Sequence, residues 1–313
     1  MNLLLIVCSV CSGAAVVGLS ALWVVETLKA RRQGGFRSVL QRRYLHIVMS
    51  ALCSDRGAVP RFPMLRRVGS RLVLAETLAG VVSMTYGLDV GLLRQVVARY
   101  GLDRWLLRRV RFAQGYRRAR YLALLAVLPV GEGIPPRMAR YGRSRNRYVR
   151  FFALMTRVSA EPLAALRRLA DYAGPFSDTE VAEIMTWLRR GALPVAYEPL
   201  VASPSFNLRR VGLCVVRQFG IEEAEPLLLH LLDGEEPYAS GAEALFTLCA
   251  LHRPLVRREV SRCVARLSPS QRRTLMRYMA QCSYSPQVLS RLFDDSESAY
   301  YDTIVRSYKR CLV

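Results

Sequence analysis

The amino-acid sequence predicts an all-α protein in which a single N-terminal transmembrane helix precedes an α-solenoid of antiparallel helix pairs. Two observations lead to this prediction: residues 1–25 carry no charge, and apolar positions recur downstream at spacings of 30 to 32 residues. A third, a composition of 52% hydrophobic and 22% charged residues, is typical of a packed chain rather than a disordered one. The 313 residues suffice for one extended domain or two compact ones after the anchor.

The uncharged run 1–25 is the predicted transmembrane anchor. A helix needs roughly 20 apolar residues to cross the hydrocarbon core of a bilayer, and this run meets that length. A cleaved signal peptide would have a basic start, a shorter apolar stretch and a small-x-small cleavage site, and the sequence before Glu26 does not offer these in order. The two alternatives, a cleaved signal peptide and a buried core helix, therefore fit the run less well.

Basic residues follow the run closely, beginning with Lys29, Arg31 and Arg32. Because positive charge near a span stays on the cytoplasmic side, we expect the N-terminus outside and residues 26–313 in the cytoplasm. The localisation predicted from these flanks is that of a single-pass membrane protein, for example in a bacterial inner membrane.

A second apolar stretch, 72–88, is predicted to be a buried helix and not a second span. Glu76 lies inside it, and an ionised glutamate near the centre of a bilayer costs several kcal/mol. Gly80 and Gly87 also interrupt the stretch. The segment 121–130 is too short to cross a bilayer.

The charge of the chain is concentrated next to the predicted anchor. Residues 26–150 hold 26 basic and 6 acidic residues, whereas residues 151–313 hold 20 and 18. A basic surface gains about 1 kcal/mol per suitably placed Lys or Arg near anionic headgroups, so we expect the first half to face anionic membrane lipid. The same surface suits nucleic-acid phosphates. Only Lys29 and Lys309 are lysines, a skew that fits a GC-rich coding sequence as well as a functional demand.

Five segments align as repeats of one helix. They start at Ala119, Val149, Val181, Val211 and Ala242, at spacings of 30, 32, 30 and 31 residues. The third and fourth positions after each start are apolar in every copy, as the buried stripe of a helix requires. A fixed period in this range is typical of a solenoid.

A second helix is predicted in the gaps between these segments. Residues 221–232 begin with acids and Pro226 and continue with leucines, and residues 160–166 follow the same design around Glu161-Pro162. Acidic side chains complement the dipole of a first helical turn, where proline also does little harm. Residues 192–205, which contain three prolines, are predicted to lengthen the connection of the third repeat.

Residues 207–254 resemble two consecutive HEAT-type repeats. The resemblance is carried by Leu208-Arg209-Arg210-Val211-Gly212-Leu213-Cys214-Val215-Val216, by Glu222 to Leu232, and by Tyr238-Ala239-Ser240-Gly241-Ala242-Glu243-Ala244-Leu245. It covers this window well and 117–191 in part. It implies a right-handed stack of antiparallel helix pairs whose concave surface binds proteins and sometimes nucleic acids, and it carries no catalytic residue over to this chain.

The remaining segments are assigned to the two ends of the stack. Residues 36–52 and 65–111 read as helices, with breaks at 57–63 and 86–89. Residues 284–292 and 300–312 read as the last helices. The predicted domains are the anchor (1–25), a basic juxtamembrane helical segment (26–64), the HEAT-like α-solenoid (65–293) and a C-terminal capping helix (294–313).

No catalytic, cofactor-binding or metal-binding residue is proposed from the sequence. Glycine-rich phosphate loops, Gly-x-Ser-x-Gly and His-Glu-x-x-His do not occur. The acidic cluster in 222–236 is interpreted as helix capping and a polar loop. The cysteines downstream of the anchor form no C-x-x-C pair and are interpreted as reduced and buried, as small hydrophobes. They are Cys53, Cys214, Cys249, Cys263, Cys282 and Cys311.

The segment 135–150 is the candidate binding site. Six arginines and two tyrosines follow a proline pair there, a combination that suits contacts with phosphates and stacking on the rings. The proposed residues are Arg137, Arg140, Tyr141, Arg143, Arg145, Arg147, Tyr148 and Arg150. We expect lipid headgroups or an acidic partner there before nucleic acid. The alternative is an ordinary loop between helices.

Together these observations predict a membrane-anchored, non-enzymatic scaffold whose helical repeats bind a partner protein, with no cofactor. One alternative is a helical-repeat protein that binds nucleic acid. The other, a lyase- or glycosylase-type enzyme on an α-solenoid, rests on analogy alone.

Overall fold

The computed structural model describes residues 35–54, 59–66, 68–85, 90–131, 133–189, 196–233, 238–294, 297, 299–304 and 306. These residues form helices and turns with no strand among them, which confirms the all-α class for this part of the chain. The predicted anchor over 1–25 lies outside the described residues. The chain divides into two compact units: unit 1 ends at Thr156 and unit 2 begins at Arg157, inside the predicted segment 65–293.

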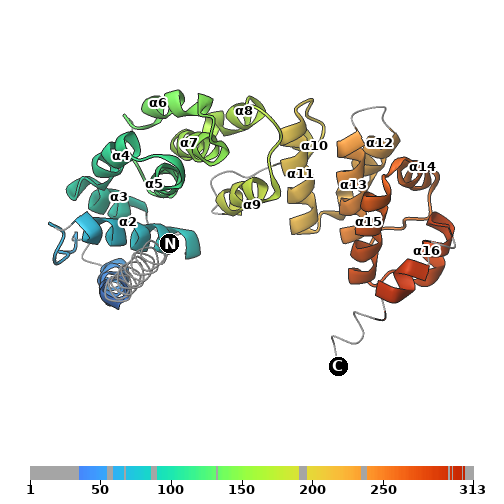
Figure 1. The fold of residues 1–313 in the computed structure, drawn as a ribbon, viewed down its shortest axis with the longest axis horizontal. Coiled ribbons are helices and arrows are strands. Elements are labelled where there is room, and N and C mark those ends of the chain that lie inside the picture. Colours follow the sequence, from blue (N-terminus) through green and yellow to red (C-terminus); the bar gives the residue numbers. More distant parts are fainter. Residues whose placement is uncertain are drawn as a thin grey trace, which may run out of the picture. The chain divides into compact units, whose positions relative to one another are not determined.

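The described part of unit 1 opens with helical residues 35–52 and continues through helices of 4 to 17 residues. The labelled elements are α2 (Val68–Met84), α3 (Val90–Arg99), α4 (Leu102–Phe112), α5 (Gly115–Val127), α6 (Pro135–Met138), the 3-10 turn η1 (Ala139–Arg143) and the larger part of α7 (Arg147–Ala160) (Figure 1). The predicted helices 36–52 and 65–111 are therefore present. One break was missed: Gly101 has a φ of 55°, a left-handed conformation that glycine adopts readily, and it separates α3 from α4.

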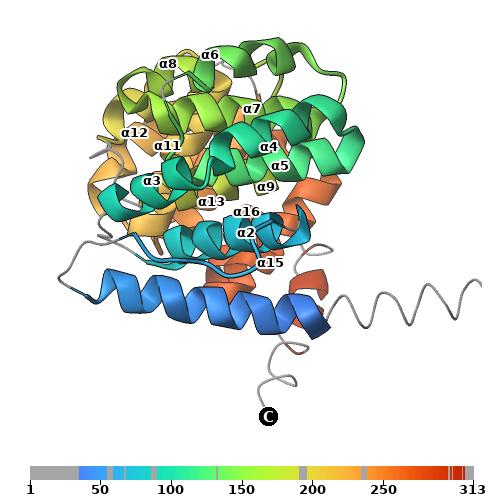
Figure 2. The same cartoon turned by 90° about the vertical axis from the view of Figure 1, so that its left-hand side faces the viewer.

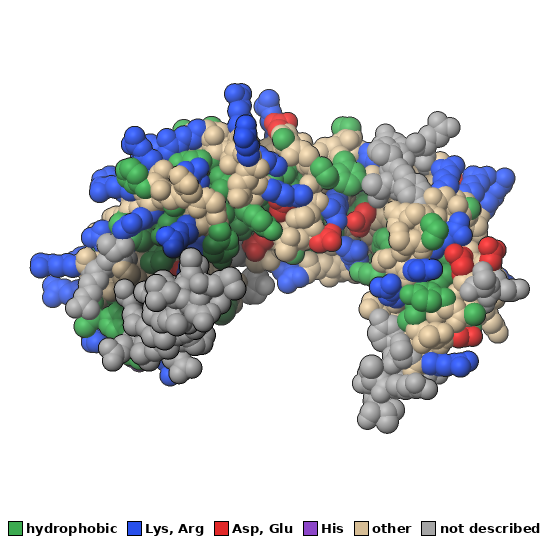
Figure 3. All heavy atoms as spheres, in the orientation of Figure 1, with side chains coloured by type: hydrophobic (Ala, Val, Ile, Leu, Met, Phe, Trp, Pro, Cys, Tyr) green, Lys and Arg blue, Asp and Glu red, His purple; other side chains and the backbone are tan. Residues whose placement is uncertain are grey.

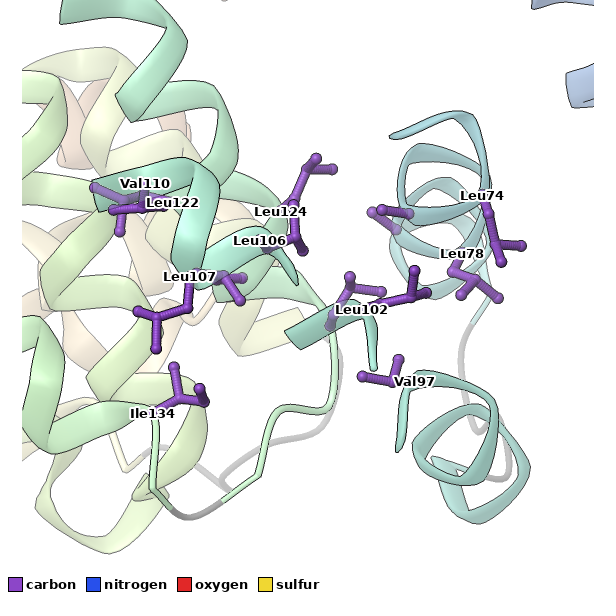
Figure 4. Packing of buried hydrophobic residues seen from close by; sticks show 14 of the residues in the cluster. Leu74, Leu78, Val97, Leu102, Leu106, Leu107, Val110, Leu122, Leu124 and Ile134 are labelled. Carbon is purple, nitrogen blue, oxygen red and sulfur yellow. The ribbon is translucent and has the colours of Figure 1, made fainter. Parts of the chain in front are cut away.

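One apolar core holds unit 1 together. Leu74 and Leu78 of α2 are completely buried, and Leu106 of α4 and Leu122 of α5 are buried with them. Figure 4 shows these leucines gathered with valines of α3 and α4. The stretch 72–88 is thus a core helix as predicted, although it ends at Met84. Within the described part of the chain, no helix has both the length and the apolar character needed to cross a membrane.

Unit 2 consists of a regular succession of helices. They are η2 (Pro162–Ala164), α8 (Ala165–Ala170), α9 (Asp178–Trp187), α10 (Glu198–Val201), α11 (Phe206–Phe219), η4 (Glu222–Ala224), α12 (Glu225–Asp233), α13 (Tyr238–Ala250), α14 (Arg258–Arg266), α15 (Pro269–Gln281), α16 (Pro286–Leu292) and helical residues 299–304. The second helices over 160–166 and 221–232 were predicted correctly. The region of α14 and α15 was assigned to the predicted α-solenoid 65–293 without bounds for its individual helices.

Alternate helices of unit 2 pack side by side. Helix α11 contacts both α9 and α13, α13 contacts α15, and α12 contacts α14 (Figure 1). Consecutive helices also pair, as in α10 with α11 and α12 with α13. Each helix of unit 2 therefore finds its main partners close by in the sequence.

The stretch 192–205 was predicted to lengthen a connection, and in part it forms a helix. Residues 198–201 make α10, and Pro199 occupies its first turn, where a missing N–H does least harm. Leu200 and Val201 are buried against α11. Glu198-Pro199 thus repeats the pattern of Glu161-Pro162 and Glu225-Pro226, and α10 is a shortened second helix of the third repeat.

The five aligned repeat starts occupy equivalent places in five helices. They lie in α5, α7, α9, α11 and α13, and each of these residues is at most 5% exposed. The residues are Ala119, Val149, Val181, Val211 and Ala242. The 30- to 32-residue period therefore located the five helices and a buried residue in each. Of the predicted stripe, Ala123, Phe152, Cys214 and Phe246 are half-buried and the other six positions are buried.

Polar contacts in unit 2 also join residues about one repeat apart. The Oδ1 of Asn207 accepts a hydrogen bond from the backbone N–H of Phe176 at 3.0 Å, and an Nη1 of Arg209 donates to the hydroxyl of Ser240 at 3.1 Å. Arg210 forms an ion pair with Asp178 of the preceding helix α9. Its Nη2 also lies 3.4 Å from Oε1 of Glu243 in the following helix α13. These contacts tie α11 to the helices that precede and follow it in the side-by-side series.

Candidate functional site

Unit 1 is rich in arginine and poor in carboxylates. Its described residues include 21 arginines and no lysine, with Glu76 and Asp103 as the acidic residues. The described residues of unit 2 include 17 arginines and 15 acidic residues. Figure 3 reflects this difference, since Asp and Glu are visible mainly over unit 2. Two carboxylates cannot neutralise 21 guanidinium groups, so unit 1 has a strongly positive surface.

Glu76 occupies a particular place in this positive unit. Its carboxylate forms ion pairs with Arg37 of the first helix and Arg120 of α5. The pairing explains how an acidic side chain is accommodated in the apolar helix α2, because a mostly buried charge needs a partner. It also links the helix 35–52 near Arg37 to the middle of α5.

The eight residues proposed from the sequence lie on the segment that joins α5 to α7. Arg137 belongs to α6, Arg140, Tyr141 and Arg143 to η1, Arg145 to the following turn, and Arg147, Tyr148 and Arg150 to α7. The exposed members are Arg137, Arg140, Arg143, Arg145, Arg147 and Tyr148. The structure thus gathers six of the eight side chains on the surface of one segment, and it places the other two differently.

Tyr141, one of the two proposed residues that are not exposed, is buried. The Cζ atoms of Arg140 and Arg118 lie 4.7 and 5.7 Å from the centroid of its ring, and Arg140 also donates a hydrogen bond of 2.7 Å to its hydroxyl. Such cation–π contacts stabilise the packing of η1 beside the start of α5. Stacking of a ligand therefore falls to Tyr148, which is 60% exposed.

Arg150, the second proposed residue that is not exposed, is half-buried. One Nη1 donates hydrogen bonds to the backbone oxygens of Ser144 at 2.8 Å and Arg145 at 3.3 Å. Asn146 accepts a hydrogen bond from the N–H of Val149 at 3.2 Å in the first turn of α7. Arg150 therefore fixes the loop that presents the exposed arginines.

The acidic cluster of unit 2 has a role that the sequence interpretation missed. Glu222 and Glu225 do lie in the first turns of η4 and α12, as capping predicts. In addition, Glu225 pairs with Arg253 and Arg257, and an Nη1 of Arg253 lies 2.8 Å from Glu222. The sequence signal that could have revealed these ion pairs is the spacing of the partners, which are separated by about one repeat period.

The cysteines offer little reactivity in the described part of the chain. Cys249 and Cys263 are buried, and burial raises the pKa of the Cys263 thiol to about 11 and that of Cys249 as well. A protonated thiol is a poor nucleophile and a poor metal ligand. Cys214 and Cys282 are half-buried; Cys53 is exposed, so the expectation of burial was wrong there. Among the described residues, no group of three or more His, Cys, Asp or Glu side chains is arranged to hold a metal ion.

Comparison of the chain with models of protein families, with curated proteins and with solved structures returns no match.

Proposed function

We propose that this chain is a membrane-anchored, non-enzymatic scaffold in which unit 1 lies against anionic lipid and unit 2 binds a partner protein. The observation that carries the proposal is the contrast in charge between the units. Their described residues hold 21 arginines and two carboxylates in unit 1, against 17 arginines and 15 carboxylates in unit 2. Near an anionic membrane each well-placed arginine contributes about 1 kcal/mol. The uncharged run 1–25 precedes the more basic unit and supports an N-terminus outside and both units in the cytoplasm.

For unit 2 we propose a right-handed α-solenoid of the HEAT type. Two observations support it: alternate helices contact one another, and the polar links of α11 reach residues about one repeat away on both sides. Repeats that contact only their neighbours build extended surfaces that suit protein partners. Among the described residues of unit 2, three large apolar side chains are exposed and mark candidate contacts: Leu163 at 97%, Phe219 at 60% and Val256 at 43%.

Photo-cross-linking in living cells tests the partner. Only Lys29 and Lys309 carry lysine amines, so amine-reactive reagents would sample the chain poorly. We therefore place p-benzoylphenylalanine in the full chain at Leu163, Phe219 or Val256, with the exposed Thr186 as a polar control. We expect the same protein to be cross-linked reproducibly from at least one of the three positions and not from the control.

The scaffold proposal fails if mass spectrometry finds no reproducible protein adduct at any of the three apolar positions. It also fails if Thr186 yields the same adducts in the same amounts, since that pattern reports collision and not a specific surface.

A second candidate function is binding of nucleic acid, which the exposed Tyr148 beside Arg143 and Arg145 favours. For the full chain in nanodiscs of zwitterionic lipid, this function predicts salt-dependent binding of single-stranded RNA or DNA. Replacing Arg143, Arg145 and Arg147 with alanine is then expected to lower the slope of log affinity against log salt by about 2. Absence of binding at low salt would exclude this candidate.

A further inference from the structure

The exposed aromatic rings of unit 1 are not scattered over its surface. Among its described Phe, Tyr and Trp residues, the exposed ones are Phe36 at 46%, Phe112 at 79%, Tyr116 at 77% and Tyr148 at 60%. Phe36 lies at the residue-35 end of the first helix, Phe112 and Tyr116 flank the first residue of α5, and Tyr148 is in the first turn of α7. Phe112 thus ends α4, Tyr116 and Tyr148 lie in the first turns of α5 and α7, and Phe36 is the second described residue of the first helix.

Ion pairs and a cation–π contact link the first helix, α5 and the segment that precedes α7. Glu76 pairs with both Arg37 and Arg120, which links the first helix near Arg37 to the middle of α5. Arg118 of α5 lies over the ring of Tyr141, which precedes α7, and its Nε donates to the backbone oxygen of Ala113 at 2.8 Å. Figure 2 shows the residue-35 end of the first helix and the turn between α4 and α5 toward the same side of unit 1.

Exposed arginines lie close in the sequence to three of these rings, those of Phe112, Tyr116 and Tyr148. Arg111 and Arg117 lie next to Phe112 and Tyr116, and the Cζ of Arg111 is 5.9 Å from the ring centroid of Phe112. Arg143 and Arg145 precede Tyr148 and are exposed as well. We call this set the arginine–aromatic edge: Phe36, Phe112, Tyr116, Tyr148, Arg111, Arg117, Arg143 and Arg145. Between residues 104 and 156, the described part of the chain contains no carboxylate.

We propose that the arginine–aromatic edge is the part of unit 1 that rests on the bilayer. In this arrangement, the four rings lie at the level of the headgroups and the arginines contact phosphates of anionic lipids. The inference rests on the proposed function and names the surface through which unit 1 carries it out.

The chemistry of the edge matches a membrane interface in two respects. Aromatic side chains concentrate at the boundary between headgroups and acyl chains, where an amphipathic or apolar ring is partly desolvated. Arginine keeps its charge at all relevant pH values and contacts phosphate through a planar fork of donors. Beside this edge Glu76 pairs with Arg37 and Arg120. Positive charge that complements an anionic surface is added by the exposed Arg111, Arg117, Arg143 and Arg145.

Chain length ties the same edge to a bilayer. Residues 26–34 alone separate the uncharged run 1–25 from the residue-35 end of the first helix. Fully extended, this linker reaches about 30 Å. An anchor in the bilayer therefore keeps Phe36, and with it the arginine–aromatic edge, close to the membrane surface.

Lipid photo-cross-linking tests the orientation. The full chain is reconstituted in nanodiscs of phosphatidylcholine with phosphatidylglycerol, with p-benzoylphenylalanine in place of Phe112, Tyr116 or Tyr148. Met84 at the end of α2 and Val90 at the start of α3 are the matched controls, because both are exposed and apolar but lie outside the edge. We expect lipid adducts at the three edge positions in at least about fivefold excess over the controls.

A charge control uses two triple variants of the same size. R111A/R117A/R145A removes arginines of the edge, and R94A/R99A/R104A removes exposed arginines of α3 and α4 that lie outside it. Only the first is expected to lower the adduct yield at Phe112, and omission of phosphatidylglycerol is expected to lower it too.

The outcomes separate this inference from the proposed function. Adducts at Met84 and Val90 equal to or above those at the edge would overturn the orientation, while leaving unit 1 on the membrane. Equal effects of the two triple variants would likewise overturn it. Absence of lipid adducts at all five positions would contradict the lipid contact in the proposed function itself.

Discussion

Replacing Gly212 with alanine is expected to destabilise unit 2 by about 2 kcal/mol, because α10 and α11 approach each other too closely for a methyl group. A Cβ atom at this position would lie 2.7 Å from the Cβ of Leu200 and 2.8 Å from the backbone nitrogen of Val201. Neither atom is the flexible end of a side chain, so α10 itself must move. The loss outweighs the gain of about 1 kcal/mol that alanine brings to a helix interior.

Hydrogen exchange of the full chain, followed by mass spectrometry, measures this effect locally. Amides of α10 and α11 are expected to open roughly 30-fold more often in the G212A variant. G241A is the matched control in the neighbouring helix α13, since its Cβ would meet no atom closer than 3.7 Å. That variant should be neutral or slightly more stable. The close approach of α10 and α11 is refuted if the amides of α10 and α11 in G212A exchange as slowly as those of α13 in G241A, each relative to the parent chain.

Replacing Asn207 with alanine is expected to destabilise the connection between α8 and α9 by about 3 kcal/mol, through loss of buried hydrogen bonds. The side chain accepts one from the N–H of Phe176 at 3.0 Å. It donates to the backbone oxygens of Gly174 at 3.0 Å and Tyr172 at 3.4 Å. Asn207 is 6% exposed, so water does not readily replace these partners.

The same exchange measurement reports the result. Amides of residues 172–181 and of the first turn of α11 are expected to exchange roughly 100-fold faster in N207A than in the parent chain. N146A provides an asparagine control: that side chain accepts a hydrogen bond from Val149 in the half-exposed first turn of α7, and its loss should cost about 1 kcal/mol. An effect of N207A no larger than that of N146A would show that the buried bonds contribute little.

Helix positions were predictable from the sequence wherever periodicity carried the information. Val181, Val211 and Ala242 are spaced by one repeat, and burial of one stripe per helix is the physical reason for that spacing. Helix α10 was missed because three prolines in 192–205 read as helix breakers, although the pair Glu198-Pro199 is a helix start. The break at Gly101 was missed because a left-handed φ within a polar sequence leaves no periodic trace.

The candidate site was predictable in composition and not in geometry. The arginines of 135–150 and the excess of basic charge are properties of the sequence itself. The burial of Tyr141 depends on Arg118 of α5, and the pairing of Glu76 depends on Arg37 and Arg120, all more than 20 residues away. Contacts at that range follow from tertiary packing, which no local pattern encodes. For the same reason the proposed arginine–aromatic edge rests on the contacts of Glu76 and Arg118 and not on a sequence pattern.

The one-repeat spacing of the polar links in unit 2 has a mechanical consequence. Contacts such as Asn207 with Phe176, Arg257 with Glu225 and the Tyr284 hydroxyl with the backbone oxygen of Arg253 join residues 31 or 32 positions apart. A mechanical force applied along the chain acts on these links one after another, because each of them joins residues only about one repeat apart. Unit 2 should therefore yield to tension in small steps, each about one repeat long, and recover each step independently.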